Sequence, residues 1–181
     1  MFVTVWQLRE ASPQLRYAED DGYRLVTVPD DIAAALGRLT DLDGRPMMDL
    51  GAYREAWNES FQYSFVDPAD LTQPERAVFT RADDIAQLAG IAIGHGRIRQ
   101  LLVSETMRMS PRGDMVLGMW DPAERRIIVR RDQLHTLARF AGTLLHELGH
   151  AISGTSDGSM EFEAELTRLP GQVASLRLSA D

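Results

Sequence analysis

The sequence predicts an α+β fold in which a small, mostly antiparallel sheet packs on a long helix that is followed by a second helix. Short β-branched and aromatic runs bounded by turn residues are typical of strands. Longer segments with apolar residues at three- and four-residue spacing are typical of amphipathic helices. A length of 181 residues with a hydrophobic fraction of 44% supports a single core. We therefore expect one compact unit overall.

The composition restricts the chemistry. The chain has no Cys, which excludes disulfides, thiolate metal ligands and cysteine nucleophiles. All 19 basic residues are Arg, and the absence of Lys excludes Schiff-base catalysis. Any metal site must therefore use His and carboxylate ligands.

The charge and hydropathy favour an acidic protein of the cytoplasm. The net charge is −8, which disfavours nucleic acid as a partner. Residues 97–139 are locally basic, and we interpret their arginines as the solvated face of a sheet. The N-terminal residues lack the pattern of a signal peptide, and no apolar run is long enough to cross a membrane.

Residues 1–60 are predicted to form an α/β segment. The expected elements are strands at 2–8 and 22–28, a helix at 32–39 with Asp30 as its N-cap, and a helix at 47–59. No motif in this segment carries recognisable chemistry. Its acidic balance suggests packing or docking of a regulatory protein partner.

Residues 61–181 are predicted to form the core that carries the site. Thr72 and Glu75 have the spacing of a capping box, which opens a helix that extends to about Gly90. The expected strands are 61–66, 97–107, 115–121 and 125–131, with a turn at 111–113. The four-residue turn Asp121-Pro122-Ala123-Glu124 joins the last two strands, so we expect them to form an antiparallel hairpin.

A long amphipathic helix follows the hairpin. Asp132 is its expected N-cap, and Gly154 is its expected end. Its apolar stripe comprises Leu134, Leu137, Ala141, Leu144, Leu145, Leu148 and Ile152. Gly149 lies inside this helix, where a glycine costs about 1 kcal/mol, and we expect it to let another backbone approach the metal face.

His146, Glu147 and His150 form an HExxH motif beside the apolar stripe. Residues four apart on a helix share a face, so both imidazoles can bind one metal ion. The intervening glutamate then lies where a general base is needed. The motif predicts a zinc hydrolase site.

A catalytic zinc ion normally takes three protein ligands, so one more is required. Phe162, Leu166 and Leu169 predict a second helix that ends at Pro170-Gly171. Glu163 on this helix is the preferred third ligand. Three other carboxylates stay open as alternatives: Glu161, Glu165 and Asp157.

The HELGH sequence followed by a glutamate on the next helix resembles the zincin metallopeptidases of the gluzincin type, especially their small intracellular members. Residues 61–171 also resemble a zincin-like module of bacterial chains that carry a histidine-kinase-like ATPase domain. The resemblance implies that His146, His150 and Glu163 bind zinc and that Glu147 is the general base. It also implies a donor to the oxyanion, for which we considered Arg168, His95 and an upstream Tyr.

The expected function is hydrolysis of peptide bonds in an intracellular protein or peptide by a zinc-activated water molecule, with Glu147 as the base. The alternative is a zincin fold with little or no catalysis that serves as a sensing or interaction module. A third reading, hydrolysis of a non-peptide substrate, differs little from the first in its sequence requirements.

Overall fold

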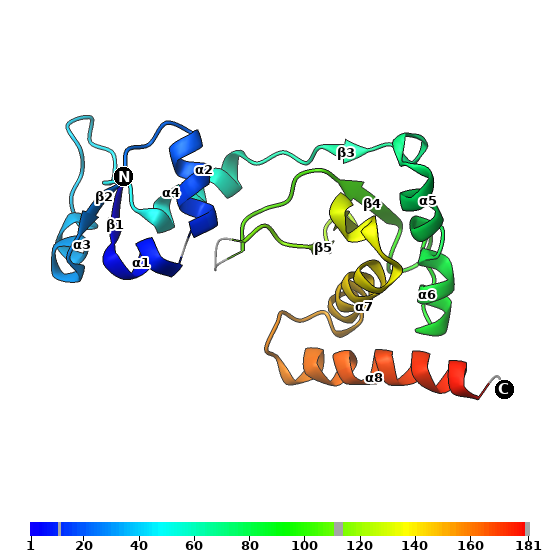
Figure 1. Ribbon diagram of the computed structural model, residues 1–181. Helices are drawn as coiled ribbons and strands as arrows, with labels where there is room; N and C mark the ends of the chain where they lie inside the picture. Colours follow the sequence, from blue (N-terminus) through cyan, green and yellow to red (C-terminus); the bar gives the residue numbers. More distant parts are fainter. Residues whose placement is uncertain (11, 111–113, 180–181) are drawn as a thin grey trace. The chain divides into compact units, whose positions relative to one another are not determined.

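A computed structural model describes residues 1–10, 12–110 and 114–179. It divides into two compact units, Met1–Gln62 with Arg108–Met115 and Tyr63–Met107 with Val116–Asp181 (Figure 1). We call these the first unit and the second unit. The turn predicted at residues 111–113 lies outside the described residues.

In its described residues, the first unit combines two short strands with four helices. Its elements are β1 (Phe2–Thr4), α1 (Val5–Glu10), α2 (Ser12–Asp20), β2 (Val26–Val28), α3 (Asp30–Leu36) and α4 (Leu50–Ser60). The two strands pair in parallel. Buried side chains from β1, α2 and α4 form one core cluster, which comprises Val3, Leu15 and Leu50. A second cluster comprises Ala18, Tyr53 and Met109.

Two local predictions for the first unit are wrong. The predicted strand 2–8 ends at Thr4, because Thr4 and Gln7 cap a helix reciprocally: each backbone N–H donates to the other residue's side chain, at 2.9 and 3.3 Å. Helix α3 has Pro29 as its N-cap, and Asp30 is instead its first residue. There Asp30 contributes negative charge to the first turn, where the helix dipole favours it.

The second unit is a mixed α+β assembly around a four-stranded sheet. Its strands are β3 (Phe65–Val66), β4 (Gln100–Ser104), β5 (Gly118–Asp121) and β6 (Arg126–Arg130). Its helices are α5 (Gln73–Phe79), α6 (Ala82–Leu88), α7 (Leu137–Ser153) and α8 (Met160–Leu178), with short 3-10 turns η1 (Pro68–Asp70) and η2 (Arg131–His135). The prediction of an α+β fold with a small sheet is confirmed.

The strand order is β3-β4-β6-β5. The predicted hairpin is confirmed, since β5 and β6 pair antiparallel with Met119 opposite Ile128. Strand β3 also pairs antiparallel with β4, whereas β4 and β6 are parallel. Strand β6 is therefore central and its residues 127–129 are fully buried, whereas β5 is an edge strand.

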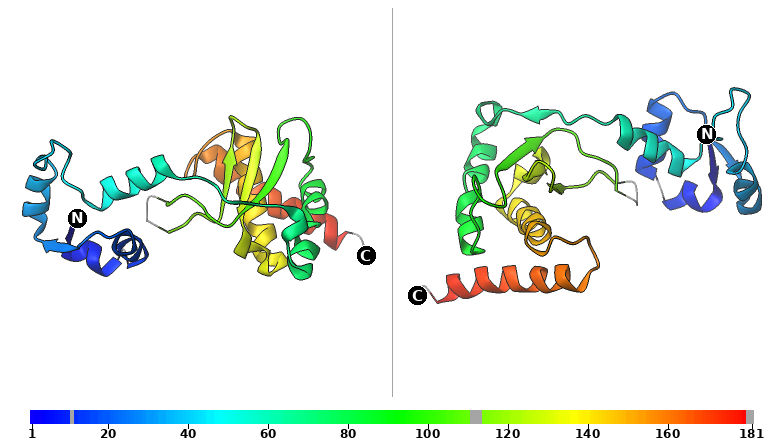
Figure 2. Two further views of the ribbon diagram at one scale, coloured as in Figure 1. Left: turned by 90° about the horizontal axis from the view of Figure 1, so that it is seen from above. Right: turned by 180° about the vertical axis from the view of Figure 1, so that it is seen from behind.

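Helix α7 lies between the sheet and α8 (Figures 1 and 2). Phe140, Leu144 and Leu148 on α7 are fully buried and belong to the core cluster that includes β4, β6 and α8. This burial removes the apolar face of the helix from water and fixes its rotation. The remaining face of α7 is left for the HExxH side chains.

The start of α7 differs from the prediction, and its end agrees. Asp132 is not its N-cap: its carboxylate accepts hydrogen bonds from Arg130 and Gln133, and η2 intervenes. Thr136 caps α7 instead by accepting from the N–H of Arg139. As predicted, α7 ends at Gly154, whose φ of 71° suits a glycine.

Helix α8 is longer than predicted. It continues through Pro170 to Leu178, so the break expected at Pro170-Gly171 is absent from the described helix. Leu169 is fully buried in the core cluster shared with α7, directly before the proline. This packing holds the helix across a residue that lacks a backbone donor. No helix in the described parts of the chain is both long and apolar enough to cross a membrane.

The predicted capping box at Thr72 and Glu75 is confirmed, although the helix divides into α5 and α6. Glu75 also accepts two hydrogen bonds from the Arg131 guanidinium at 2.8 Å. Arg131 donates further to Glu105, so it connects α5, η2 and the end of β4. These Arg131 bonds lower the pKa of Glu75 from 4.5 to about 2.

We expect Glu75→Gln to lower the free energy of unfolding at pH 7 by about 1–2 kcal/mol. Because the folded pKa of Glu75 is depressed, its contribution exists above pH 4.5 and is lost as the pH falls towards 2. Urea titrations between pH 7 and 2 should show the deficit shrinking over this window. Glu124→Gln, an exposed control, should show no such trend; a deficit constant with pH would contradict the prediction.

Candidate metal centre

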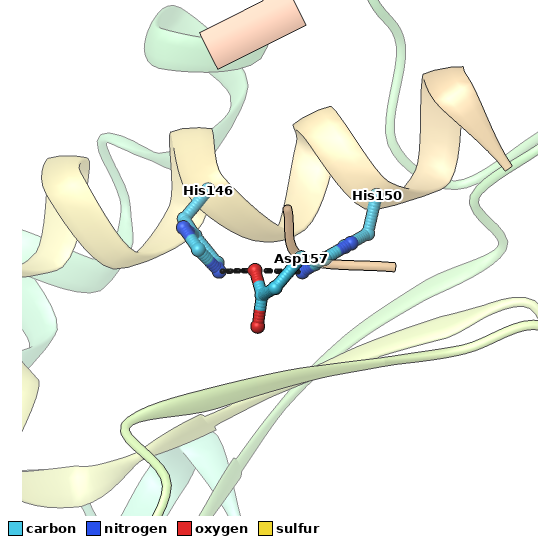
Figure 3. Close-up of side chains that lie close together, drawn as sticks. All are labelled: His146, His150 and Asp157. Carbon is cyan, nitrogen blue, oxygen red and sulfur yellow. Dashed lines mark ion pairs between the residues drawn. The ribbon is translucent and has the colours of Figure 1, made fainter. Parts of the chain in front are cut away.

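The two histidines of the HExxH motif lie side by side on α7. Their ring centroids are 4.9 Å apart, as the four-residue spacing predicts. His146 is half-buried and His150 is more deeply placed, with 15% of its side chain exposed. Both Nε2 atoms point to the same side of the helix (Figure 3).

Asp157 completes this group from the loop after α7. Its Oδ1 lies 3.3 Å from Nε2 of His146 and 3.3 Å from Nε2 of His150 (Figure 3). Two glycines with positive φ, Gly154 and Gly158, reverse the chain on either side of it. One ligand atom from each of the three residues lies within 4.8 Å of the others, so the group could hold a metal ion.

His150 is oriented by a hydrogen bond on its other nitrogen. Its Nδ1 lies 2.9 Å from the carbonyl oxygen of Thr155. A carbonyl oxygen only accepts, so Nδ1 carries the proton in this contact. In the neutral imidazole with this tautomer, Nε2 is the unprotonated nitrogen and has its lone pair available for a metal.

Phe162 on α8 packs against both imidazoles. Its ring stacks on that of His150, at 4.0 Å and 10°, and meets that of His146 edge-on at 5.0 Å. Phe162 is almost completely buried, so it fixes the orientation of both rings. A Cβ on Gly149 would lie 3.2 Å from the Phe162 ring. The missing side chain of Gly149 therefore leaves room for the ring of Phe162. The prediction that it lets another backbone approach is wrong.

Glu147 lies on the opposite flank and is 5% exposed. Its pKa is raised to about 8, chiefly by burial and also by the negative charge of Asp157, while a hydrogen bond from the Trp120 N–H acts in the opposite direction. Trp120 belongs to the edge strand β5. The carboxyl group is therefore held between α7 and the sheet.

Gly118 makes this packing possible. A Cβ at this position of β5 would lie 2.6 Å from Cγ2 of Thr143 and 2.9 Å from Cγ and Oε1 of Glu147. Both are shorter than van der Waals contact. Only a glycine allows the edge strand to approach α7 this closely at Glu147.

The pKa of His146 is lowered, chiefly by burial and also by the neighbouring His150. The carboxylates of Asp157 and Glu163 act in the opposite direction. The neutral imidazole, which is the form that binds metals, is thereby favoured.

The other candidate third ligands do not join the group in the described residues. Glu163 is exposed on α8 and near enough to influence the pKa of His146. Glu161 is also exposed, and Glu165 forms an ion pair with Arg168 at 2.8 Å. The structure thus brings Asp157 to the histidines, whereas the sequence favoured Glu163, whose ligand role stays a prediction.

A cavity of about 950 Å³ opens over the histidines and Glu147. Strand β5 and the segment before it form one wall, α7 forms another, and the loop that carries Asp157 closes one end. The groups considered as oxyanion donors lie elsewhere: Arg168 bonds to Glu165 and Gln172, and His95 lies on an exposed loop. Neither of these, and no Tyr, is among the described residues that line the cavity.

Three groups that shape the site were not predicted from the sequence: the Trp120 N–H, Gly118 and the ring of Phe162. The Trp120 N–H is a backbone group, and Gly118 acts through the absence of a side chain, so neither has a motif. Phe162 was expected only as a buried residue of the second helix. The sequence did contain a signal for Phe162, which directly precedes Glu163, the predicted ligand. In the structure the Phe162 ring lies against that of His150.

Compared with protein-family models, with curated proteins and with solved structures, the chain matches none of them.

We expect Gly118→Ala to lower the free energy of unfolding by about 1–3 kcal/mol, because its Cβ would overlap Thr143 and Glu147. Adding Thr143→Ser removes the nearest methyl group and should restore part of the loss. Gly142→Ala is the matched control, since its Cβ would meet nothing within 4 Å. It should be neutral or stabilising by up to about 1 kcal/mol. Equal effects of the two alanines in urea titrations would contradict this packing.

Proposed function

We propose that the protein is a zinc-dependent peptidase in which Glu147 is the general base. The observation that carries the proposal is the position of Glu147, buried at the cavity wall beside a His146, His150 and Asp157 group. A purely structural metal site has no need of such a carboxyl group. The HExxH motif and the small sheet beside its helix support a zincin-like fold.

The donor set fits zinc. A tetrahedral zinc ion with bonds of about 2.0–2.1 Å has ligand atoms about 3.3–3.4 Å apart. The two His–Asp distances of 3.3 Å agree with this spacing. Two imidazoles and one carboxylate are a ligand set of catalytic zinc sites, which leave a fourth position for water.

A zinc ion held by His146, His150 and Asp157 would supply a water molecule of lowered pKa and polarise the carbonyl that is attacked. Glu147 takes the proton from the water and passes it to the leaving amine. Burial raises the pKa of this carboxyl group, and the positive charge of a zinc ion on His146 and His150 would lower it again, so that the carboxylate could accept the proton. The Trp120 N–H holds the carboxyl group in place while the proton moves.

The cavity wall supports a peptide as substrate. Leu117, Met119 and Asp121 face β6, because Leu117 accepts a bond from Arg130 and the pairing alternates along β5. The backbone groups of Gly118 and Trp120 therefore face away from β6, where the Trp120 N–H already donates to Glu147. The backbone groups of Gly118 and the carbonyl of Trp120 are left for an extended peptide, and intracellular proteins or peptides are the proposed substrates.

A second candidate is a sensing or interaction module with little catalysis. It is favoured by the lack of an oxyanion donor among the candidates named from the sequence. Both functions require metal binding. Only peptide hydrolysis requires Glu147 as a general base.

We expect the purified protein to bind about one zinc ion and His146→Ala to lose it. Asp157→Asn should weaken binding by about 100-fold or more, as the loss of one of three ligands predicts. Glu163→Gln is the matched comparison and should retain most of the affinity. Calorimetric titration with zinc measures all four. Loss of zinc from Glu163→Gln alone would restore the assignment made from the sequence.

We expect Glu147→Gln to abolish cleavage of peptides, with a loss of about 100- to 10,000-fold, while zinc content is unchanged. Glu161→Gln, exposed on α8, is the control and should cleave normally. The measurement is mass spectrometry of a peptide mixture, prepared by digesting a proteome, after incubation with each protein. Equal peptide patterns from wild type and Glu147→Gln would favour the module without catalysis.

A further inference from the structure

The cavity beside the metal group has one arginine in its lining. Of the described residues that line it, only Arg139 is a permanent cation, and the acidic residues Glu147 and Asp157 lie nearer the histidines. The chain as a whole is strongly acidic, with a net charge of −8. Arg139 therefore adds a positive charge to this wall of the cavity, although the protein as a whole is negatively charged.

Arg139 is exposed and has no ion-pair partner among the described residues. Five other arginines of the second unit form such pairs: Arg81, Arg126, Arg130, Arg131 and Arg168. Its guanidinium group is therefore available to a carboxylate, with which it can form two parallel hydrogen bonds.

The other polar group at this end of the cavity is already committed. Gln133 is 5% exposed, and its amide donates to Asp132 and accepts from Thr143. These bonds fix the orientation of the amide. The neighbouring lining residues Val116, Leu117 and Ala138 are apolar. Arg139 is thus the positively charged side chain that a ligand would meet here.

The distance from Arg139 to the metal group suits an extended peptide. Arg139 precedes His146 by seven residues, about 10.5 Å along the helix axis. This length equals about three residues of extended chain. Strand β5 borders the same cavity and runs in the direction of α7, since Leu117, directly before it, bonds to the end of β6, before the helix, and Trp120 bonds to Glu147 within the helix. A peptide along β5 would therefore pass from Arg139 towards the histidines.

We propose that Arg139 determines specificity by binding a substrate carboxylate about three residues from the scissile bond, on the side of the N-terminal half of α7. The inference rests on the proposed peptide hydrolysis and names its substrate class. The carboxylate is either an Asp or Glu side chain or the C-terminus of the peptide, because both present the same group to a guanidinium.

The test uses randomised octapeptides, one library with free and one with amidated C-termini, and zinc-loaded protein. Mass spectrometry of the products should show Asp or Glu favoured over Lys or Arg by about tenfold near the third position from the cut. Enrichment in both libraries identifies a side chain; cleavage confined to the free library, at a fixed distance from its end, identifies the terminal carboxylate.

Arg139→Glu should invert this preference towards Lys and Arg, and Arg139→Ala should abolish it. Arg99→Ala is the matched control, because it removes an exposed arginine of the same unit outside the cavity lining. Cleavage with the same preference in wild type and Arg139→Glu would overturn the inference and leave the peptidase proposal standing.

A binding measurement separates the two proposals if no peptide is cleaved. Fluorescence anisotropy of labelled acidic, neutral and basic octapeptides on Glu147→Gln protein does not depend on turnover. Tighter binding of the acidic peptide, lost when Arg139→Glu is added, supports the carboxylate site even if hydrolysis fails. Equal affinities for the three peptides, or an acidic preference that survives Arg139→Glu, would overturn it.

Discussion

The contact between helix α7 and the edge strand β5 is the constraint on which the candidate site depends. The apolar face of α7 is buried against the sheet and α8, so the helix cannot rotate to relieve a clash on its other flank. Glu147 is consequently pressed against β5, where the missing side chain of Gly118 leaves room for it. The Trp120 N–H compensates part of the cost of burying the carboxyl group there.

The histidines depend on a second close contact, on the side of α8. Gly149 leaves space for the Phe162 ring, which lies against both imidazoles. The helix that the sequence predicted to supply a ligand thus contributes an aromatic support in the structure. One glycine on each flank of the motif therefore determines how closely β5 and α8 can approach it.

The sequence predicted those parts of the fold that depend on local spacing. The HExxH geometry, the β5–β6 hairpin, the capping box at Thr72 and the end of α7 at Gly154 each follow from a few neighbouring residues. The start of α7 was wrong, because the carboxylate of Asp132 is engaged by Arg130 and Gln133. The continuation of α8 through Pro170 depends on packing against α7, which no local pattern reveals.

The prediction of the site was limited in the same way. Helical spacing placed Glu163 on a plausible flank, but the path of the loop after Gly154 decides which carboxylate reaches the histidines. Two glycines with positive φ, Gly154 and Gly158, determine that path. The sequence shows that these residues are glycines but not the direction in which each one turns the chain.

Because Asp157 follows His146 by only eleven residues, the whole donor set comes from one short stretch of chain. A metal bound there would act as a short-range cross-link that fastens the last turn of α7 to its following loop. Closing so small a loop costs little chain entropy. Metal loss would therefore loosen the end of α7 and the loop while leaving the sheet intact. Occupancy of the site would thus change the local stability of this segment and not the stability of the whole fold.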